Sequence, residues 1–311
     1  MWALMLGISW GLMGCSDAQT NSVDPCATQV LVEDGCDPLA PTQCGFPFPN
    51  NFWLQEDSST VTGHRVAFGP TTLPAAAGYG HIDPQWWADS DGFSGGQPAL
   101  VHLPGATITG LPTQHDIETS LSDSSPTIIL DAETGERVAH FSEIDRSVPQ
   151  DLDEDRTLIV RPVIRLKDAT RYIVAVRHVV DVDGNEIAPS PSFVALRDGS
   201  AACEPGIEAR RPLYDDIFAK LEKAGVARKD LQIAWDFSTS SRENNTRFLV
   251  AMRDDALAKV GTDGPEYTLT KTEEFTEAEN THIWRRFTGM MKVPLYLDKP
   301  GPGGKLVLGP D

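Results

Sequence analysis

Two hydrophobic patterns follow one another along the chain. From Gly45 onward, short apolar runs are separated by Gly, Pro, Asp and Asn, and after Cys203 apolar residues recur at helical spacing. The runs expected as strands are 98–103, 127–130, 137–141, 157–162, 172–180 and 192–196. Residues 131–135 and 181–185 fall between strands and predict hairpin turns. Many short strands predict a mainly β fold, an Ig-like β-sandwich over residues 46–205.

The pattern after Cys203 predicts a helix, a strand and a second helix. Pro212 suits the first turn of the first helix, and Gly225 suits its C-terminal cap. The apolar face of that helix is Leu213, Ile217 and Leu221. Residues 231–237 alternate as a strand, and Thr239 or Ser240 can cap the second helix. The apolar stripe of the second helix is Leu249, Met252, Ala256 and Val260.

Residues 266–275, 283–297 and 305–308 return to β character, with a turn-rich break at 299–304. Together with the two helices they make an α+β segment over residues 206–311. The last apparent strand lies only three residues before Asp311, with no polar tail after it. We therefore expect the chain to be part of a larger architecture.

Charge and cysteine content narrow the function classes. The chain has 26 Lys and Arg against 45 Asp and Glu, a net charge of −19, and no basic cluster. Nucleic acid is therefore not an expected partner, because phosphate binding needs a basic surface. Of the five cysteines, Cys26, Cys36, Cys44 and Cys203 remain if Cys15 is set apart, and four cysteines allow three pairings. The short Cys36–Cys44 spacing favours a local disulfide, which leaves Cys26 to pair with Cys203, as an oxidising compartment permits.

The first residues predict export. An apolar run from Trp2 to Met13 is too short to span a bilayer and ends in Leu12-Met13-Gly14-Cys15. This resembles a bacterial lipoprotein signal peptide, although no Lys or Arg precedes Cys15. The resemblance implies a signal peptide over residues 1–14, lipidation of Cys15, and a disulfide-bearing tether over 15–45. Two or three acyl chains would hold the protein at a membrane. Ser16 after the cysteine implies the outer membrane or cell surface.

One motif invites a catalytic interpretation. Residues 92–96, Gly-Phe-Ser-Gly-Gly, match the G-x-S-x-G elbow of serine hydrolases around Ser94. An elbow needs a strand before the serine and a helix after it, whereas here a loop precedes Ser94 and a predicted strand follows. We therefore predict that Ser94 is not a nucleophile and that the chain has no catalytic residue of its own.

Other candidate sites are weaker. The seven histidines form no close pair, no C-x-x-C is present, and residues 181–185 lack the distal Glu of an EF-hand, so neither a metal nor another cofactor is expected. The adjacent Trp86 and Trp87 are either a stacking platform for sugar or lipid or residues divided between core and loop packing. Their exposure distinguishes the two interpretations.

Four short motifs carry a family resemblance: residues 44–50 (CGFPFPN), 91–94 (DGFS), 169–174 (ATRYIV) with Asp183-Gly184, and 234–240 (AWDFSTS). They resemble the N-terminal region of bacterial surface lipoproteins related to virulence-factor-type extracellular lipases. The resemblance covers about residues 40 to 311. It implies a β-rich accessory region followed by an α/β-hydrolase domain with its own serine elbow, outside this chain.

The sequence thus predicts the non-catalytic region of an exported, lipid-anchored lipoprotein whose complete form hydrolyses carboxylic esters, with no cofactor. One rival is a surface module that binds carbohydrate or protein near Trp86 and Trp87. A second rival is a small serine esterase that uses Ser94. Lipid esters and glycans are the ligands that these alternatives imply.

Overall fold

A computed structural model of the chain describes residues 26, 32–33, 35–76, 78–147 and 155–307. Its helices are α1 (Pro191–Asp198), α2 (Ile207–Lys223) and α3 (Arg242–Val260), with short 3-10 helices η1 (Asn51–Trp53), η2 (Pro84–Trp87), η3 (Ile117–Leu121) and η5 (Arg228–Asp230). The strands are β1 (Leu54–Glu56), β2 (His64–Val66), β3 (Ala75–Ala76), β4 (Gly80–His81), β5 (Ala99–His102), β6 (Thr127–Asp131), β7 (His140–Ile144), β8 (Thr157–Pro162), β9 (Arg171–Arg177), β10 (Leu231–Ser238), β11 (Tyr267–Glu274) and β12 (Arg285–Met291).

The described fold is mixed α+β, with several small antiparallel sheets. Two sheets have three strands, in the orders β5-β8-β7 and β10-β9-β6, and three sheets are two-stranded pairs: β1-β2, β3-β4 and β11-β12. None of these sheets closes into a barrel within the described part of the chain. Strand β10 pairs with β9 from Leu231 opposite Arg177 to Ser238 opposite Arg171. The region after Cys203 therefore adds a strand to the sheet of the region before it.

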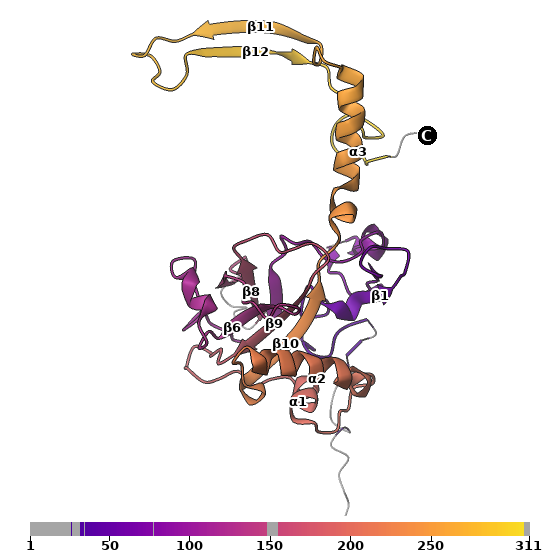
Figure 1. Cartoon of the computed structure of the whole chain (residues 1–311), viewed down its shortest axis with the longest axis vertical. Coiled ribbons are helices and arrows are strands. Elements are labelled where there is room, and N and C mark those ends of the chain that lie inside the picture. Colours follow the sequence, from indigo (N-terminus) through magenta and orange to yellow (C-terminus); the bar gives the residue numbers. More distant parts are fainter. Residues whose placement is uncertain (1–25, 27–31, 34, 77, 148–154, 308–311) are drawn as a thin grey trace, which may run out of the picture.

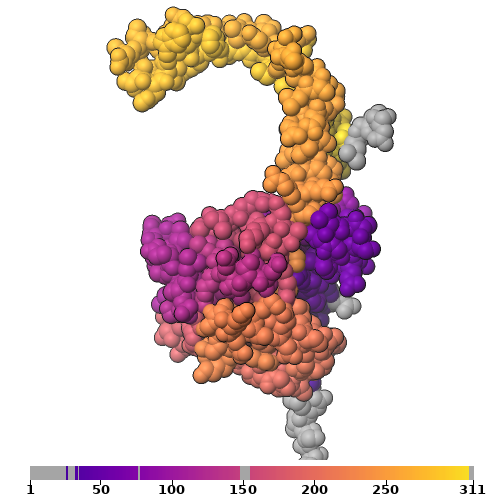
Figure 2. Space-filling view, in the orientation of Figure 1, coloured from indigo at the N-terminus to yellow at the C-terminus, as the bar shows by residue number. Residues whose placement is uncertain are grey.

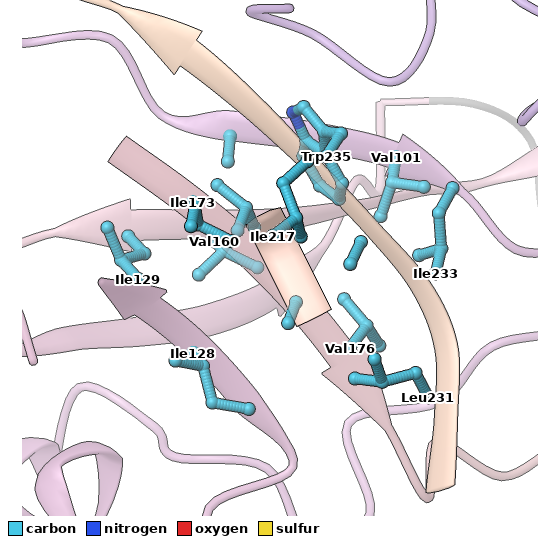
Figure 3. Close-up of a cluster of buried hydrophobic side chains, with 14 of the residues drawn as sticks. Val101, Ile128, Ile129, Val160, Ile173, Val176, Ile217, Leu231, Ile233 and Trp235 are labelled. Atoms are coloured by element: carbon cyan, nitrogen blue, oxygen red, sulfur yellow. The ribbon is translucent and has the colours of Figure 1, made fainter. Parts of the chain in front are cut away.

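One hydrophobic cluster joins both three-stranded sheets to the helices (Figure 3). Every residue of β9 from Tyr172 to Arg177 is buried, as is β10 from Leu231 to Phe237. This fits the near-continuous apolar run of β9, because a strand covered on both faces needs no polar alternation. In Figure 3 the side chains of Ile217 from α2, Val160 from β8 and Trp235 from β10 converge on one cluster. Of the helix face predicted from the sequence, Ile217 and Leu221 are buried, whereas Leu213 is exposed and Tyr214 and Phe218 complete the buried face instead.

The prediction of a strand over residues 192–196 is wrong, because these residues lie in α1. Ser190 accepts the backbone N–H of Phe193 as N-cap, and Pro191 occupies the first turn. Gly199 ends the helix with a φ of 72°, a left-handed conformation that glycine adopts without steric cost. The N-cap, proline and glycine signals were therefore present in the sequence. A five-residue apolar run does not by itself distinguish strand from buried helix.

Two helix starts also differ from expectation. Helix α2 begins at Ile207, so Pro212 lies inside it rather than in its first turn. The earlier start brings the fully buried Ile207 into the core, which offsets the hydrogen bond that Pro212 cannot donate. Helix α3 is capped by Ser241 rather than by Thr239 or Ser240, whose side chains bond to other segments instead.

The structure confirms both expected disulfides. Cys36 pairs with Cys44, and Cys26 pairs with Cys203 in the connection between α1 and α2. The same N-terminal segment is also held by a buried ion pair, in which Arg210 of α2 donates to both carboxylate oxygens of Asp37. We call the described residues before α3 the body. These contacts join the start of the described chain to the side of the body that α1 and α2 cover (Figure 1). Cys15 lies outside the described residues.

Candidate functional site

Ser94 lies in a turn that leads into a strand. Its side chain is exposed, its Oγ accepts the backbone N–H of Gly96 at 3.2 Å, and β5 follows after the turn. Among the described residues, no imidazole or carboxylate is hydrogen-bonded to this hydroxyl. A nucleophile needs a base within hydrogen-bond reach and oxyanion donors at a helix N-terminus. In the part of the chain that the structure describes, the Ser94 hydroxyl is bonded to no base, and a strand rather than a helix follows it.

Gly92 and Gly95 have a packing role instead. A Cβ on Gly92 would lie 2.7 Å from the backbone nitrogen of Ser240, and a Cβ on Gly95 would lie 2.8 Å from the carbonyl oxygen of Leu166. Both distances are below van der Waals contact, so only glycine allows these backbones to approach. Gly92 of the G-x-S-x-G pattern is therefore required for packing, and so is Gly95 at its variable position, whereas a Cβ on Gly96 would meet only the Ser94 Oγ, at 3.8 Å.

The short motifs meet where β10 ends and α3 begins. Phe93 forms a parallel bridge with Thr239, donating to the Ser238 carbonyl at 2.9 Å and accepting from the Ser240 N–H at 2.7 Å. From the other side, Thr239 donates its backbone N–H to the Thr170 carbonyl at 2.9 Å. We call residues 91–93, 169–170 and 239–241 the joint. Sequence alone identified the motifs, but the tertiary structure brings them together.

The remaining motif, residues 44–50, supports the joint from the core. The indole N–H of Trp235 donates to the Pro49 carbonyl at 2.8 Å, and the Phe48 ring meets the Phe93 ring edge-on at 5.5 Å between centroids. Buried donors of this kind need a partner, and the Pro49 carbonyl supplies it. These four motifs therefore build one structural connection rather than a catalytic centre, whereas Asp183-Gly184 lies apart from it in the exposed turn that follows β9.

The joint fixes the base of α3. The buried Asp91 carboxylate accepts the Ser240 hydroxyl at 2.5 Å and the Ser241 N–H at 3.0 Å, a negative charge at the positive end of the helix dipole. Asn244 donates to the Asp89 carbonyl at 2.7 Å. These bonds connect the first turn of α3 to the loop that carries the G-x-S-x-G motif, and so set the direction in which the helix leaves the body.

Beyond the joint, residues 242–307 form an arm that projects from the body (Figure 1). No residue of α3, β11 or β12 is buried, so the predicted apolar stripe of the second helix covers no core. Figure 2 shows the arm as a hook with a hollow between the β11-β12 hairpin and the body. The exposed large apolar residues of the arm are Phe248, Leu249, Val250, Leu257, Tyr267, Leu269, Trp284, Phe287, Met290, Met291, Val293, Leu295, Leu306 and Val307.

Three apolar side chains of the hairpin share one face with the Glu274–Arg285 ion pair, and the charges of the hairpin pair with one another. Tyr267 lies opposite Met291 and Phe287 opposite Thr272, which places the three apolar side chains on the same face. The acidic residues of β11 pair with the basic residues of β12: Glu274 with Arg285, and Glu273 with Arg286. The large exposed side chains of the hairpin that form no ion pair are therefore apolar, and Arg285 lies 5.8 Å from the centre of the Phe287 ring. An isolated two-stranded hairpin is marginally stable in water, so this face needs a covering.

The chain after β12 returns to α3. The Tyr296 hydroxyl donates to the Asp255 carboxylate at 2.6 Å, and this hydrogen bond raises the pKa of Tyr296 to about 12. The same hydroxyl lies 3.0 Å from the Met252 carbonyl, so Tyr296 connects the segment after β12 to α3. Sequence periodicity gave α3, β11 and β12, but β12 ends at Met291 rather than at Leu297. The expected strand from residue 305 is wrong for the described residues 305–307, among which Leu306 forms an isolated bridge with Leu297.

The two tryptophans of the predicted platform have different environments. Trp87 packs against the hydrophobic core, whereas Trp86 is 74% exposed. The described residues contain no group of three or more His, Cys, Asp or Glu placed to hold a metal ion. Helices long and apolar enough to cross a bilayer are likewise absent from the described ranges.

A cavity of about 480 Å³ lies between the N-terminal segment and the start of α2, lined by Pro38, Asn51, Phe52, Ile207 and Arg210 among others. Burial opposes the charge of Arg210, yet the adjoining Asp37 carboxylate holds the pKa of this guanidinium above its ordinary value. Both guanidinium ends already donate to Asp37, and the Phe52 ring lies 5.2 Å from the Arg210 carbon. The positive charge of Arg210 in this cavity is therefore already paired with Asp37, and this pair stabilises the fold.

Comparison with known proteins places the chain in no family: no family model matches it, and neither a curated protein nor a solved structure does.

Proposed function

We propose that this chain is the non-catalytic region of an exported, lipid-anchored protein whose complete form is a lipase-like serine hydrolase. The observation that carries the proposal is the arm, whose large apolar side chains stay exposed in the described structure. Many exposed apolar side chains on one projecting segment favour an interaction site. A hydrolase domain of the complete protein, as the resemblance to extracellular lipases implies, would cover it.

Three further features support this assignment. Ser94 lacks the strand-turn-helix setting of an elbow. The disulfide between Cys26 and Cys203 fits an oxidising, extracytoplasmic compartment. The β5-β8-β7 and β10-β9-β6 sheets contribute to one hydrophobic cluster, which supports an Ig-like sandwich as the finer description of the body, built from strands of residues 46–205 together with β10. Lipidation at Cys15 would place the protein at the cell envelope, on the outer membrane or cell surface.

A fluorophosphonate probe, which labels activated serines, tests the catalytic part. The isolated 311-residue chain should give no labelling and no turnover of a short-chain p-nitrophenyl ester, with or without Ser94→Ala. The protein recovered from the native envelope should be labelled on a serine outside residues 1–311. Labelling of the isolated chain that disappears with Ser94→Ala would instead establish the small-esterase alternative.

Palmitate incorporation tests the anchor separately. Expressed in a diderm bacterium behind a basic n-region, the protein should incorporate labelled palmitate and partition into detergent, and Cys15→Ala should abolish both. Unchanged labelling in that variant would refute lipidation at Cys15.

A further inference from the structure

We propose that the exposed indole of Trp86 is a stacking subsite for a neutral polysaccharide. The Trp86 ring lies 6.3 Å from the Trp87 ring at an interplanar angle of 28°, and Trp87 meets Phe68 edge-on at 6.2 Å. Phe68 in turn contacts Phe93 in the core at 6.4 Å. A chain of four aromatic rings therefore leads from the hydrophobic core to the surface and supports the outermost ring from behind.

The backbone under Trp86 is held at both ends. At the start of η2, the Asp83 carboxylate accepts the Gln85 N–H at 3.0 Å. After η2, Ser90 donates to the Trp87 carbonyl at 2.9 Å, and the Asp89 carbonyl accepts the side chain of Asn244 from α3. The backbone that carries the indole is thus held in place, which reduces the conformational entropy that binding costs. An exposed tryptophan supported in this way can contact a ligand, whereas a tryptophan packed in the core cannot.

The residues around Trp86 indicate which class of ligand the indole would bind. An aromatic face carries negative charge density and attracts the C–H face of a sugar ring. Asp83, Gln85 and Asp89, close to Trp86 in the sequence, are exposed and carry polar groups that can bond to sugar hydroxyls. No Lys or Arg occurs between Arg65 and Arg137, and in space the Arg247 guanidinium is already 3.7 Å from the Asp89 carboxylate. Anionic glycans and anionic lipid headgroups are therefore disfavoured, and an uncharged polysaccharide is favoured.

Position argues against a membrane as the partner. Through Asp89, η2 lies at the base of α3. The disulfide between Cys26 and Cys203 connects the N-terminal segment beside α1 and α2, on the opposite side of the body (Figure 1). Trp86 therefore lies away from the end at which an N-terminal lipid anchor would hold the body. This inference does not depend on the presence of a hydrolase domain.

Affinity electrophoresis tests the proposal with the 311-residue chain. Native gels are cast with hydroxyethylcellulose, xyloglucan, mixed-linkage β-glucan, mannan or dextran, and with alginate as an anionic comparison. At least one neutral polymer should retard the protein, and Trp86→Ala should raise the dissociation constant about tenfold or more, as removal of a central aromatic contact does. Trp284→Ala is the matched control, since Trp284 is 70% exposed on the arm outside this chain of rings. The control should bind as wild type, and both variants should melt as wild type.

Three results would overturn the proposal. The first is no retardation by any of the neutral polymers. The second is an equal loss of binding in Trp86→Ala and Trp284→Ala. The third is a Trp86-dependent interaction with alginate or with phosphatidylglycerol vesicles instead of the neutral polymers, which would assign the surface to an acidic glycan or a membrane.

Discussion

The buried ion pair between Asp37 and Arg210 provides a quantitative test of how the N-terminal segment is held. The Asp37 side chain is 0% exposed, and besides Arg210 it accepts hydrogen bonds from the Asn50 amide at 2.7 Å and the Leu39 N–H at 3.0 Å. Arg210→Met would keep the apolar stem of the side chain and remove its charge. It would leave a carboxylate buried with two neutral donors and no cation.

Removing one member of a buried ion pair costs about 3 to 5 kcal/mol, since the remaining charge is uncompensated. Asn50 and Leu39 still solvate the carboxylate, so we expect the lower end, about 3 kcal/mol. For a body of this size that corresponds to a melting temperature about 6 to 12 °C lower. The double variant Asp37→Leu with Arg210→Met removes both charges and should recover most of the loss, because an apolar replacement of a buried pair is often neutral.

Urea unfolding of wild type, both single variants and the double variant gives the coupling energy directly. Arg253→Met serves as control, because Arg253 is exposed and pairs only with its exposed neighbour Asp254, so a change below about 0.5 kcal/mol is expected. The reasoning fails if Arg210→Met costs less than about 1 kcal/mol, or if the double variant is no more stable than the single ones.

Two further predictions concern pH and redox state. Burial lowers the pKa of His140, whose side chain is hydrogen-bonded to Thr127 and the Val138 carbonyl. The unfolded chain therefore binds a proton at His140 more readily than the folded protein does. Stability should therefore be complete above about pH 6.5 and fall as the pH drops below it; His140→Gln should flatten that slope in urea unfolding at pH 5 to 7, whereas an unchanged slope would contradict the assignment. The Cys26–Cys203 disulfide spans 177 residues, and the chain-entropy relation gives about 5 kcal/mol for such a closure, against about 2.5 for the 8-residue loop of the other disulfide. Replacing the Cys26 pair by alanines should lower the melting temperature more than replacing the other pair, and four reactive thiols in the unreduced native protein would refute both bridges.

Much of the local structure follows from the sequence. Apolar runs placed β5, β6, β8, β9 and β10 because each has turn residues at its ends, and turn chemistry placed the bend at residues 181–185, where the Asp181 carboxylate accepts two backbone N–H groups. Cysteine spacing indicated the disulfide pairing that the structure contains. Context around Ser94 also argued against an elbow before any geometry was known, since strand and helix signals are local in the chain.

The tertiary structure decided what these elements contact. A periodic apolar stripe shows that one side of a helix needs a covering, but not whether the covering is a core, and α3 carries its stripe in the arm while α2 buries its own. The same limit applies to the adjacent tryptophans, of which Trp87 reaches the core and Trp86 does not. It applies also to Gly92, whose role depends on a backbone about 150 residues away in sequence. Contacts between distant segments depend on how the chain packs in three dimensions, and no single sequence pattern records them.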